Sequence, residues 1–328
     1  MSASMASLPI IDIAAALQGD IEARSQAARA LDAAGRQYGF FYVTGHGVAA
    51  ALREALFAQS KAFFDQPLET KLQWHIDRST VRRGFDPVGW QSLQAGMPAD
   101  LKESFYLGVD RGVDDPLVRA QVPNQGPNQW PDEALVPGFQ AATQAYADAL
   151  SHLGHQLLGL LAQSLALPAD FFERYLTDPM PVLRLLHYPP TEQGLLAGQV
   201  GSGAHTDWGS VTLLAQDAVG GLQVQYEGQW IDVPFVPDSF VVNMGDLMAR
   251  WSNDRWRSAL HRVLPQPSQR HRYSAAYFFD IDYHAVLSAL PGCVDAAHPA
   301  RYAPITAGQH IVEMYHRTTV AAVASEGV

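Results

Sequence analysis

Residues 182–281 form a series of short apolar segments separated by turn residues, and this pattern restricts the fold more than any other feature of the sequence. Residues 222–226 alternate apolar and polar side chains strictly and end at Glu227-Gly228. Such alternation is typical of a strand with one buried face. Several short strands at regular spacing indicate a sandwich or barrel, and a double-sheet jelly roll is one way to close such a chain. Further strands are expected over residues 183–188, 230–233, 240–243 and 273–279.

The rest of the sequence predicts helices around this β region. Over residues 139–165 apolar side chains recur at helical spacing, which indicates one long helix with a single apolar face. A shorter helix is expected over residues 23–38, between strands at 8–12 and 39–48. Residues 84–138 are rich in proline and glycine and are expected to form loops.

We therefore predict a mainly β protein with flanking helices, in which a double-stranded β-helix (jelly-roll) core is braced by N-terminal helices. With 328 residues, 48% of them hydrophobic, the chain can bury one large core. The expected organisation is a single domain over residues 1–328. Within it, residues 1–180 brace the core, residues 181–285 form the core with a metal site, and residues 286–328 form a C-terminal segment with a helix near 308–319, a lid and a tail.

Two histidines and one aspartate predict the metal site. His205 and Asp207 lie two residues apart, just before the strand-forming residues 211–214. If they lie on a strand, their side chains point the same way, because the strand repeat is two residues. His261 supplies a third donor from a later segment. Two imidazoles and one carboxylate with open coordination positions are typical of non-haem Fe(II) oxygenases.

A second His-x-Asp pair, His75 and Asp77, is interpreted differently. It follows residues 67–74, which read as a charged helix that ends before a loop. Residues two apart on a helix do not face each other, so this pair is expected to be a solvated helix end.

Arg272 and Ser274 form the second half of the predicted site. On a strand they face the same side, and a guanidinium can hold a carboxylate with two hydrogen bonds while the hydroxyl adds a third. The open metal positions suit a chelating 2-oxo acid, and if that acid is 2-oxoglutarate, its far carboxylate needs such a cation. Tyr188 is expected either to add a hydroxyl contact or to pack in the core.

Composition restricts the partners. The formal net charge is −11, and the 22 Lys and Arg residues are scattered, which argues against a nucleic-acid or anionic-membrane surface. The chain contains 1 cysteine, which suits a reducing cytoplasm. We expect a cytoplasmic protein with a small-molecule substrate, no nucleic-acid or membrane partner, and an oligomeric state that the sequence leaves open.

Several segments together resemble the isopenicillin N synthase-like branch of the Fe(II)/2-oxoglutarate oxygenases. The resemblance spans nearly the full length and rests on residues 8–12, 39–47, 100–105, the His205, Asp207 and His261 triad, residues 243–246, and residues 272–274. It implies a jelly-roll fold, Fe(II) on the triad, and 2-oxoglutarate held by Arg272 and Ser274 with Tyr188 in support. It further implies hydroxylation, desaturation or cyclisation of a small molecule with O2, release of succinate and CO2, and ascorbate as a reductant.

One position departs from the family pattern. Many relatives have asparagine two residues after the arginine of the strand that contains Arg184, whereas this chain has Leu186. A polar contact to the co-substrate is therefore missing from the expected set.

The resemblance leaves the substrate and three alternatives open. Substrate contacts are expected from the rim, with cationic side chains favouring an anionic molecule; the candidates are Arg83, Phe85, Lys102, Phe105, Phe279 and Tyr315. An oxidase of the same fold would use no 2-oxoglutarate, and members that lack this co-substrate keep the Arg-x-Ser motif for another anion. A zinc hydrolase or isomerase could use the same three donors. A non-catalytic sensor would keep metal binding alone.

Overall fold

The structure is a computed structural model that describes residues 7–94, 96–191, 198–265 and 270–314. Within these ranges there is one sheet of eight strands in the order β1-β2-β10-β7-β12-β5-β4-β3, one of four in the order β6-β11-β8-β9, and the pair β13-β14. The strands are β1 (Ile10–Asp12), β2 (Phe40–Thr44), β3 (Gly84–Asp86), β4 (Glu103–Gly108), β5 (Val182–Tyr188), β6 (Ser202–His205), β7 (Val211–Gln216), β8 (Leu222–Tyr226), β9 (Gln229–Asp232), β10 (Phe240–Met244), β11 (His261–Val263), β12 (Arg272–Phe279), β13 (Val286–Leu287) and β14 (Ile305–Thr306).

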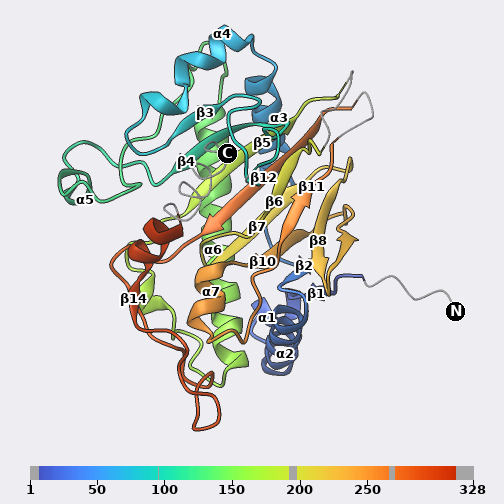
Figure 1. The fold of residues 1–328 in the computed structure, drawn as a ribbon, viewed down its shortest axis with the longest axis vertical. Helices are drawn as coiled ribbons and strands as arrows, with labels where there is room; N and C mark the ends of the chain where they lie inside the picture. Colours follow the sequence, from blue (N-terminus) through green and yellow to red (C-terminus); the bar gives the residue numbers. More distant parts are fainter. Residues whose placement is uncertain (1–6, 95, 192–197, 266–269, 315–328) are drawn as a thin grey trace, which may run out of the picture.

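Helices cover one face of the eight-stranded sheet, and the four-stranded sheet covers the other (Figure 1). The predicted long helix is confirmed as α6, which runs behind the large sheet and packs against α2 and α3. The helix α2 begins where the Asp20 side chain accepts a hydrogen bond from the backbone N–H of Ala23 at 2.9 Å. The helices are α1 (Ala14–Leu17), α2 (Ile21–Gln37), α3 (Ala50–Phe64), α4 (Leu68–Lys71), α5 (Pro116–Arg119), α6 (Phe139–Ser164) and α7 (Asp246–Trp251), with short 3₁₀ helices η1 (Leu72–Trp74), η2 (Ile76–Arg78) and η3 (Glu173–Tyr175).

Each strand of the large sheet places alternate side chains in two separate cores. On β12, Ala275, Tyr277 and Phe279 pack in the helix-side core, whereas Ala276 and Phe278 belong to the core between the sheets. The same alternation holds on neighbouring strands because the pleat has a period of two residues. This two-sheet arrangement with flanking helices confirms the predicted mainly β jelly-roll fold.

The expectation of loops over residues 84–138 is wrong in part. The strands β3 and β4 lie in this range and extend the large sheet beyond β5, with Ser104 opposite Leu186. Turn residues are dense on both sides of these strands, and they mask the short strand pattern of Glu103–Gly108. Near the C-terminus, residues 307–314 are helical, while the rest of the expected helix and the tail lie outside the described residues.

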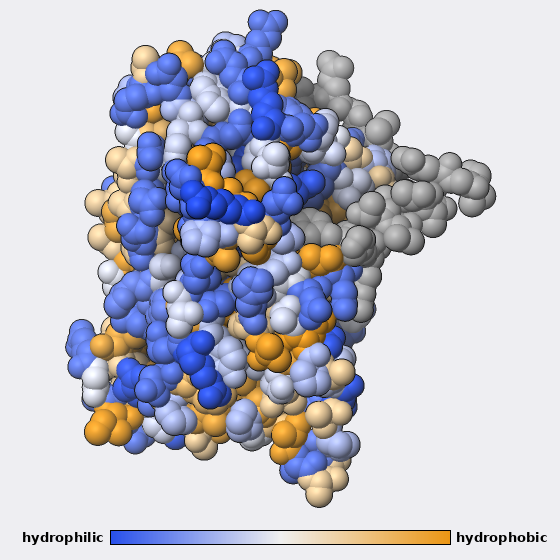
Figure 2. Space-filling model, turned by 90° about the vertical axis from the view of Figure 1, so that its left-hand side faces the viewer, coloured by the Kyte–Doolittle hydropathy of each residue, from blue (hydrophilic) through white to orange (hydrophobic). Residues whose placement is uncertain are grey.

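The surface is mixed in character. On the face shown in Figure 2, hydrophilic residues predominate and apolar ones form small separate groups. Among the helices of the described ranges, none combines the length and the hydropathy needed to cross a bilayer.

The face of β12 that packs against the helices generates a prediction about stability. Phe279 is fully buried, and its ring packs so closely on α6 that a Cβ atom added at Gly154 would lie 2.5 Å from it. Phe279→Ala is expected to lower the free energy of unfolding by about 3–5 kcal/mol, because it leaves a cavity under the helix. Urea unfolding measures this change. The matched control is Phe278→Ala, because Phe278 lies on the same strand but faces the four-stranded sheet. Equal losses of stability in both variants would contradict the assignment of the two faces.

Candidate metal centre and co-substrate cavity

Strand pairing brings together the three predicted metal donors. His205 ends β6 and lies opposite His261, the first residue of β11. Asp207 follows β6 by two residues, and its Oδ1 atom lies 3.9 Å from Nε2 of His205 and 3.6 Å from Nε2 of His261. One donor atom from each residue lies within 4.8 Å of the other two. Donors at these separations can surround a single ion.

Backbone carbonyls orient both imidazoles toward this point. Nδ1 of His205 lies 2.7 Å from the carbonyl oxygen of Gly203, and Nδ1 of His261 lies 3.2 Å from that of Ala259. A carbonyl can only accept, so each Nδ1 carries the proton and each Nε2 presents a lone pair toward Asp207. This is the tautomer that a metal-binding histidine requires.

Two hydrogen bonds to Oδ2 fix the orientation of the Asp207 carboxylate. Oδ2 accepts hydrogen bonds from Thr212 Oγ1 at 2.6 Å and from Asn243 Nδ2 at 2.7 Å, so Oδ1 is left facing the histidines. Burial alone would raise the pKa of Asp207, but the two histidines and the two hydrogen bonds outweigh it and lower the pKa. Asn243 lies on β10 and contacts the carboxylate directly.

Burial also keeps the imidazole of His205 neutral. Loss of solvent, together with the neighbouring His261, lowers the pKa of His205 to about 3. Two imidazoles and one carboxylate form the donor set that suits Fe(II) and other divalent metals. The residues present therefore fit a divalent ion. By contrast, Nδ1 of His75 accepts a hydrogen bond from the backbone of Asp77 at the start of η2, as expected for a helix end.

A cavity is lined both by the three metal donors and by the predicted co-substrate residues. It encloses about 550 Å³ between the two sheets, part of it open to solvent. Its lining is formed by Phe40, Arg184, Leu186, Tyr188, Ser202, His205, Asp207, Thr212, Leu214, Leu222, Asn243, His261, Val263, Arg272, Ser274, Ala276 and Phe278. Leu186, which replaces the frequent asparagine, is therefore part of the wall.

Arg272 is a buried cation without an acidic partner in the described part of the chain. Its side chain donates to the carbonyl of Gly220 at 2.7 Å, to Ser274 Oγ at 3.2 Å and to Gln216 Oε1 at 3.3 Å. The guanidinium lies 4.6 Å from the centre of the Tyr188 ring. It is 1% exposed, and a buried charge at such exposure ordinarily has a counter-ion. The site therefore fits a ligand carboxylate.

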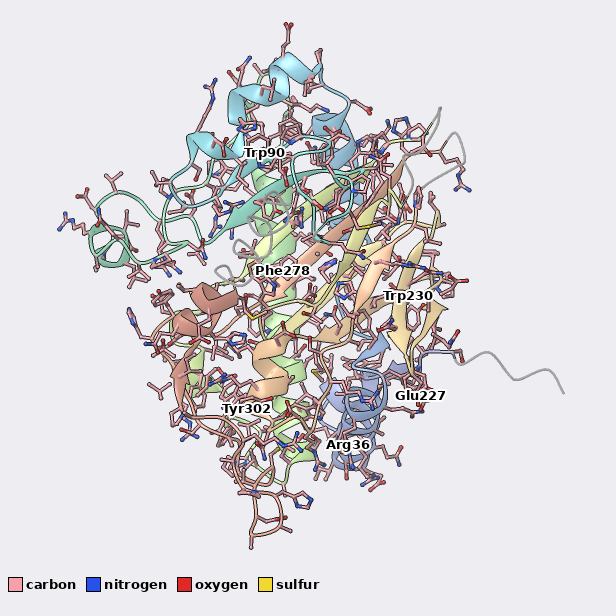
Figure 3. All side chains as sticks on the ribbon, in the orientation of Figure 1. Arg36, Trp90, Glu227, Trp230, Phe278 and Tyr302 are labelled. Atoms are coloured by element: carbon pink, nitrogen blue, oxygen red, sulfur yellow. The ribbon has the colours of Figure 1, made fainter. Side chains whose placement is uncertain are left out.

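Most predicted substrate residues do not line this cavity. Three of them are fully buried in the helix-side core, because their side chains point away from the four-stranded sheet: Phe85, Phe105 and Phe279. Arg83 lies outside the lining and donates to the carbonyl of Asn124 at 2.9 Å. Tyr315 lies outside the described residues. Phe278, labelled in Figure 3, lines the cavity in place of its neighbour Phe279, the predicted substrate contact.

Sequence reasoning missed a buried charged cluster beside the cavity. Asp86, Asp100, Lys102 and Arg184 are each less than a tenth exposed, and Lys102 forms a salt bridge with Asp100. Asp100 also accepts a hydrogen bond from the backbone N–H of Gly203 at 2.9 Å, next to the metal donors. Burial and the charge of Arg184 lower the pKa of Lys102 to about 8. Side chains alternate along β5, so Arg184 is on the same face as Tyr188, and the sequence could have revealed it in this way.

A larger hollow lies elsewhere on the molecule. Counting space open to solvent, as for the metal cavity, it has a volume of about 1450 Å³ and lies among Tyr302, Glu227 and Arg257 (Figure 3 labels the first two). None of His205, Asp207 and His261 lines it. Among the described residues, the cluster of metal donors lies in the other cavity, so the size of this hollow does not make it the metal site.

Comparisons with known proteins agree with this geometry. Residues 8–133 match the family described as the N-terminal region of a non-haem dioxygenase in morphine synthesis, and residues 179–281 match the 2OG-Fe(II) oxygenase superfamily. The chain is 37% identical over 305 residues to the 2-oxoglutarate-Fe(II) type oxidoreductase hxnY of Emericella nidulans, covering 91% of this chain and 86% of that protein. It is 40% identical over 289 residues to the 2-oxoglutarate-dependent dioxygenase citB of Monascus ruber, covering 84% and 86%.

Solved structures show the same relationship. A full-length Neurospora crassa protein in complex with alpha-KG superposes with a TM-score of 0.85 and 32% identity, covering 95% of this chain and 96% of that one. A 2OG-Fe(II) oxygenase family protein from Caulobacter crescentus gives a TM-score of 0.83 and 30% identity, covering 96% and 99%. The chain belongs to the 2-oxoglutarate- and Fe(II)-dependent oxygenase superfamily. It is an oxidoreductase that uses Fe(II) as its metal and 2-oxoglutarate as co-substrate.

The support of Asp207 generates a prediction about metal affinity. Asn243→Ala removes one of the two hydrogen bonds that direct Oδ1 toward the histidines. Metal affinity is expected to fall about 10–100-fold, the usual effect of losing such a contact behind a ligand. Equilibrium dialysis with Mn²⁺ measures this. Asp77→Asn, at the exposed carboxylate of the second His-x-Asp pair, is the control and should leave the affinity unchanged. An unchanged affinity in Asn243→Ala would argue against this ligand set.

Proposed function

We propose that His205, Asp207 and His261 hold the Fe(II) and that Arg272 and Ser274, with Tyr188, hold the far carboxylate of 2-oxoglutarate. The reaction is hydroxylation of a C–H bond in a small molecule. One oxygen atom of O2 enters the product and the other enters succinate, while the carboxyl group next to the keto group leaves as CO2. In this balance 2-oxoglutarate supplies the two further electrons that reduction of O2 requires.

The unpaired charge of Arg272 carries this proposal. A cation that is 1% exposed and has only neutral partners among the described residues is complementary to a carboxylate. It lines the same cavity as the three metal donors. A dicarboxylic 2-oxo acid can therefore bind the metal with one end and Arg272 with the other.

The protein contributes position and a dry environment. Fe(II), when bound, supplies the redox chemistry of O2 activation. Thr212 and Asn243 hold Asp207, and the two carbonyl contacts hold the imidazoles, so the donor geometry needs little rearrangement. Apolar lining residues such as Leu186 and Phe278 reduce the access of water to the reacting groups.

The substrate and the cell compartment belong to this proposal as well. The Neurospora crassa protein has also been crystallised with alpha-KG and thymine together, and this neighbour supports a compact small-molecule substrate here. We place the chain in the isopenicillin N synthase-like branch on the motifs quoted above. The single cysteine supports a reducing, cytoplasmic location.

The decisive experiment is an anaerobic titration with Fe(II) and 2-oxoglutarate. The wild-type protein should develop the visible charge-transfer band of the chelated co-substrate. In Arg272→Gln the affinity for 2-oxoglutarate should fall by at least about 30-fold, because one partner of a buried charge pair is lost. Binding of Fe(II) itself should be kept.

Two comparisons make the result specific. Arg36→Gln, a substitution of an exposed arginine, should bind 2-oxoglutarate as the wild type does. During turnover, succinate should form in proportion to product. Product without succinate would instead support the oxidase of the same fold, and a wild-type affinity in Arg272→Gln would refute the assignment of the carboxylate site.

A further inference from the structure

A second buried arginine lines the same cavity. Arg184 lies on β5, with its side chain on the same face of the large sheet as Leu186 and Tyr188. It is 8% exposed, and no part of the site described so far uses it. Unlike Arg272, it has a carboxylate beside it within the described part of the chain.

The neighbouring strand β4 and the loop before it contact one side of the Arg184 guanidinium. Nε and Nη2 donate to Ser104 Oγ at 3.1 and 2.9 Å, and Nη2 also donates to Gln91 Oε1 at 2.9 Å. The guanidinium carbon lies 4.5 Å from the centre of the Tyr106 ring. Nη1 makes no hydrogen bond with the described residues, so its two N–H groups remain to bind a ligand.

The charge of Arg184 is already balanced. Nη2 lies 3.5 Å from Oδ2 of Asp86, and behind this pair Lys102 bonds to Asp100. The cluster therefore contains two cations and two carboxylates, all buried. Arg272 has no such acidic neighbour in the described part of the chain.

This contrast decides which ligand each arginine prefers. A carboxylate placed on Arg184 would lose its hydration and bring a third negative charge to a cluster that is neutral overall. A carbonyl oxygen accepts the same N–H groups and adds no charge. Apolar side chains, Ala276 and Phe278, line the adjoining wall.

We propose that Arg184 anchors the substrate through a neutral oxygen acceptor, such as the carbonyl of an amide, imide or heterocycle, with an apolar part of the molecule against Phe278. This inference rests on the proposed function and names the substrate class of that site. It replaces the expectation from sequence that cationic rim residues favour an anionic substrate, because the charge of Lys102 is also compensated.

Matched pairs of probes test the preference. Benzamide and benzoate, and cyclohexanecarboxamide and cyclohexanecarboxylate, differ in charge at nearly constant shape. Binding is measured by equilibrium dialysis under anaerobic conditions, with the protein saturated in Fe(II) and 2-oxoglutarate so that Arg272 is occupied. Each amide should bind at least tenfold more tightly than its acid. The proposal is overturned if the acids bind as well as the amides, or if neither amide binds.

Variants then assign the preference to Arg184. Arg184→Gln should weaken amide binding at least tenfold, while Asp86→Asn, which removes the counter-ion and keeps its shape, should bring the affinities for acid and amide to within about threefold of each other. Ser104→Ala serves as a second test if Arg184→Gln does not fold, since it frees the guanidinium from behind and should also weaken amide binding. Arg36→Gln is the control. Unchanged ratios in Asp86→Asn would contradict the charge argument.

The charge-transfer band separates this inference from the proposed function. Arg184→Gln and Asp86→Asn should both keep the band formed with Fe(II) and 2-oxoglutarate. Absence of the band in the wild type would refute the co-substrate assignment, whereas a normal band with no preference for amides would refute only the role of Arg184.

Discussion

The alternation of side chains on the large sheet is the constraint on which the site depends. Every central strand is buried on both faces, so a shift by one residue would move a side chain from the cavity into the helix-side core. On β12 this places Arg272, Ser274 and Phe278 in the cavity and Phe279 under α6. Helix packing on one face thus positions the chemistry on the other.

Charge compensation explains how one cavity can distinguish two ligands. Burial makes an isolated charge costly, so each buried arginine requires either a protein carboxylate or a ligand carboxylate. Asp86 balances Arg184, whereas Arg272 has only neutral neighbours among the described residues. The same guanidinium group therefore suits a neutral acceptor at one position and an acid at the other.

Much of the fold could be predicted because its signals are local. The helical repeat over residues 139–165 and the alternation over residues 222–226 each depend on neighbours in the chain, and both elements are present in the structure. β3 and β4 were missed because they are short and flanked by turn residues. Their place is set by pairing with β5, which is distant in sequence.

By itself the sequence determined which donors are available and how they are spaced: His205 and Asp207 at a strand repeat, with Arg272 and Ser274 at another. Only the tertiary structure decided which face of each strand borders the cavity and which charges have partners. Alternation does not say which of two buried faces is the polar one, as the choice between Phe278 and Phe279 shows. A counter-ion such as Asp86 reaches Arg184 only when β3, β4 and β5 pair, so the charge balance of the cavity is a property of the fold.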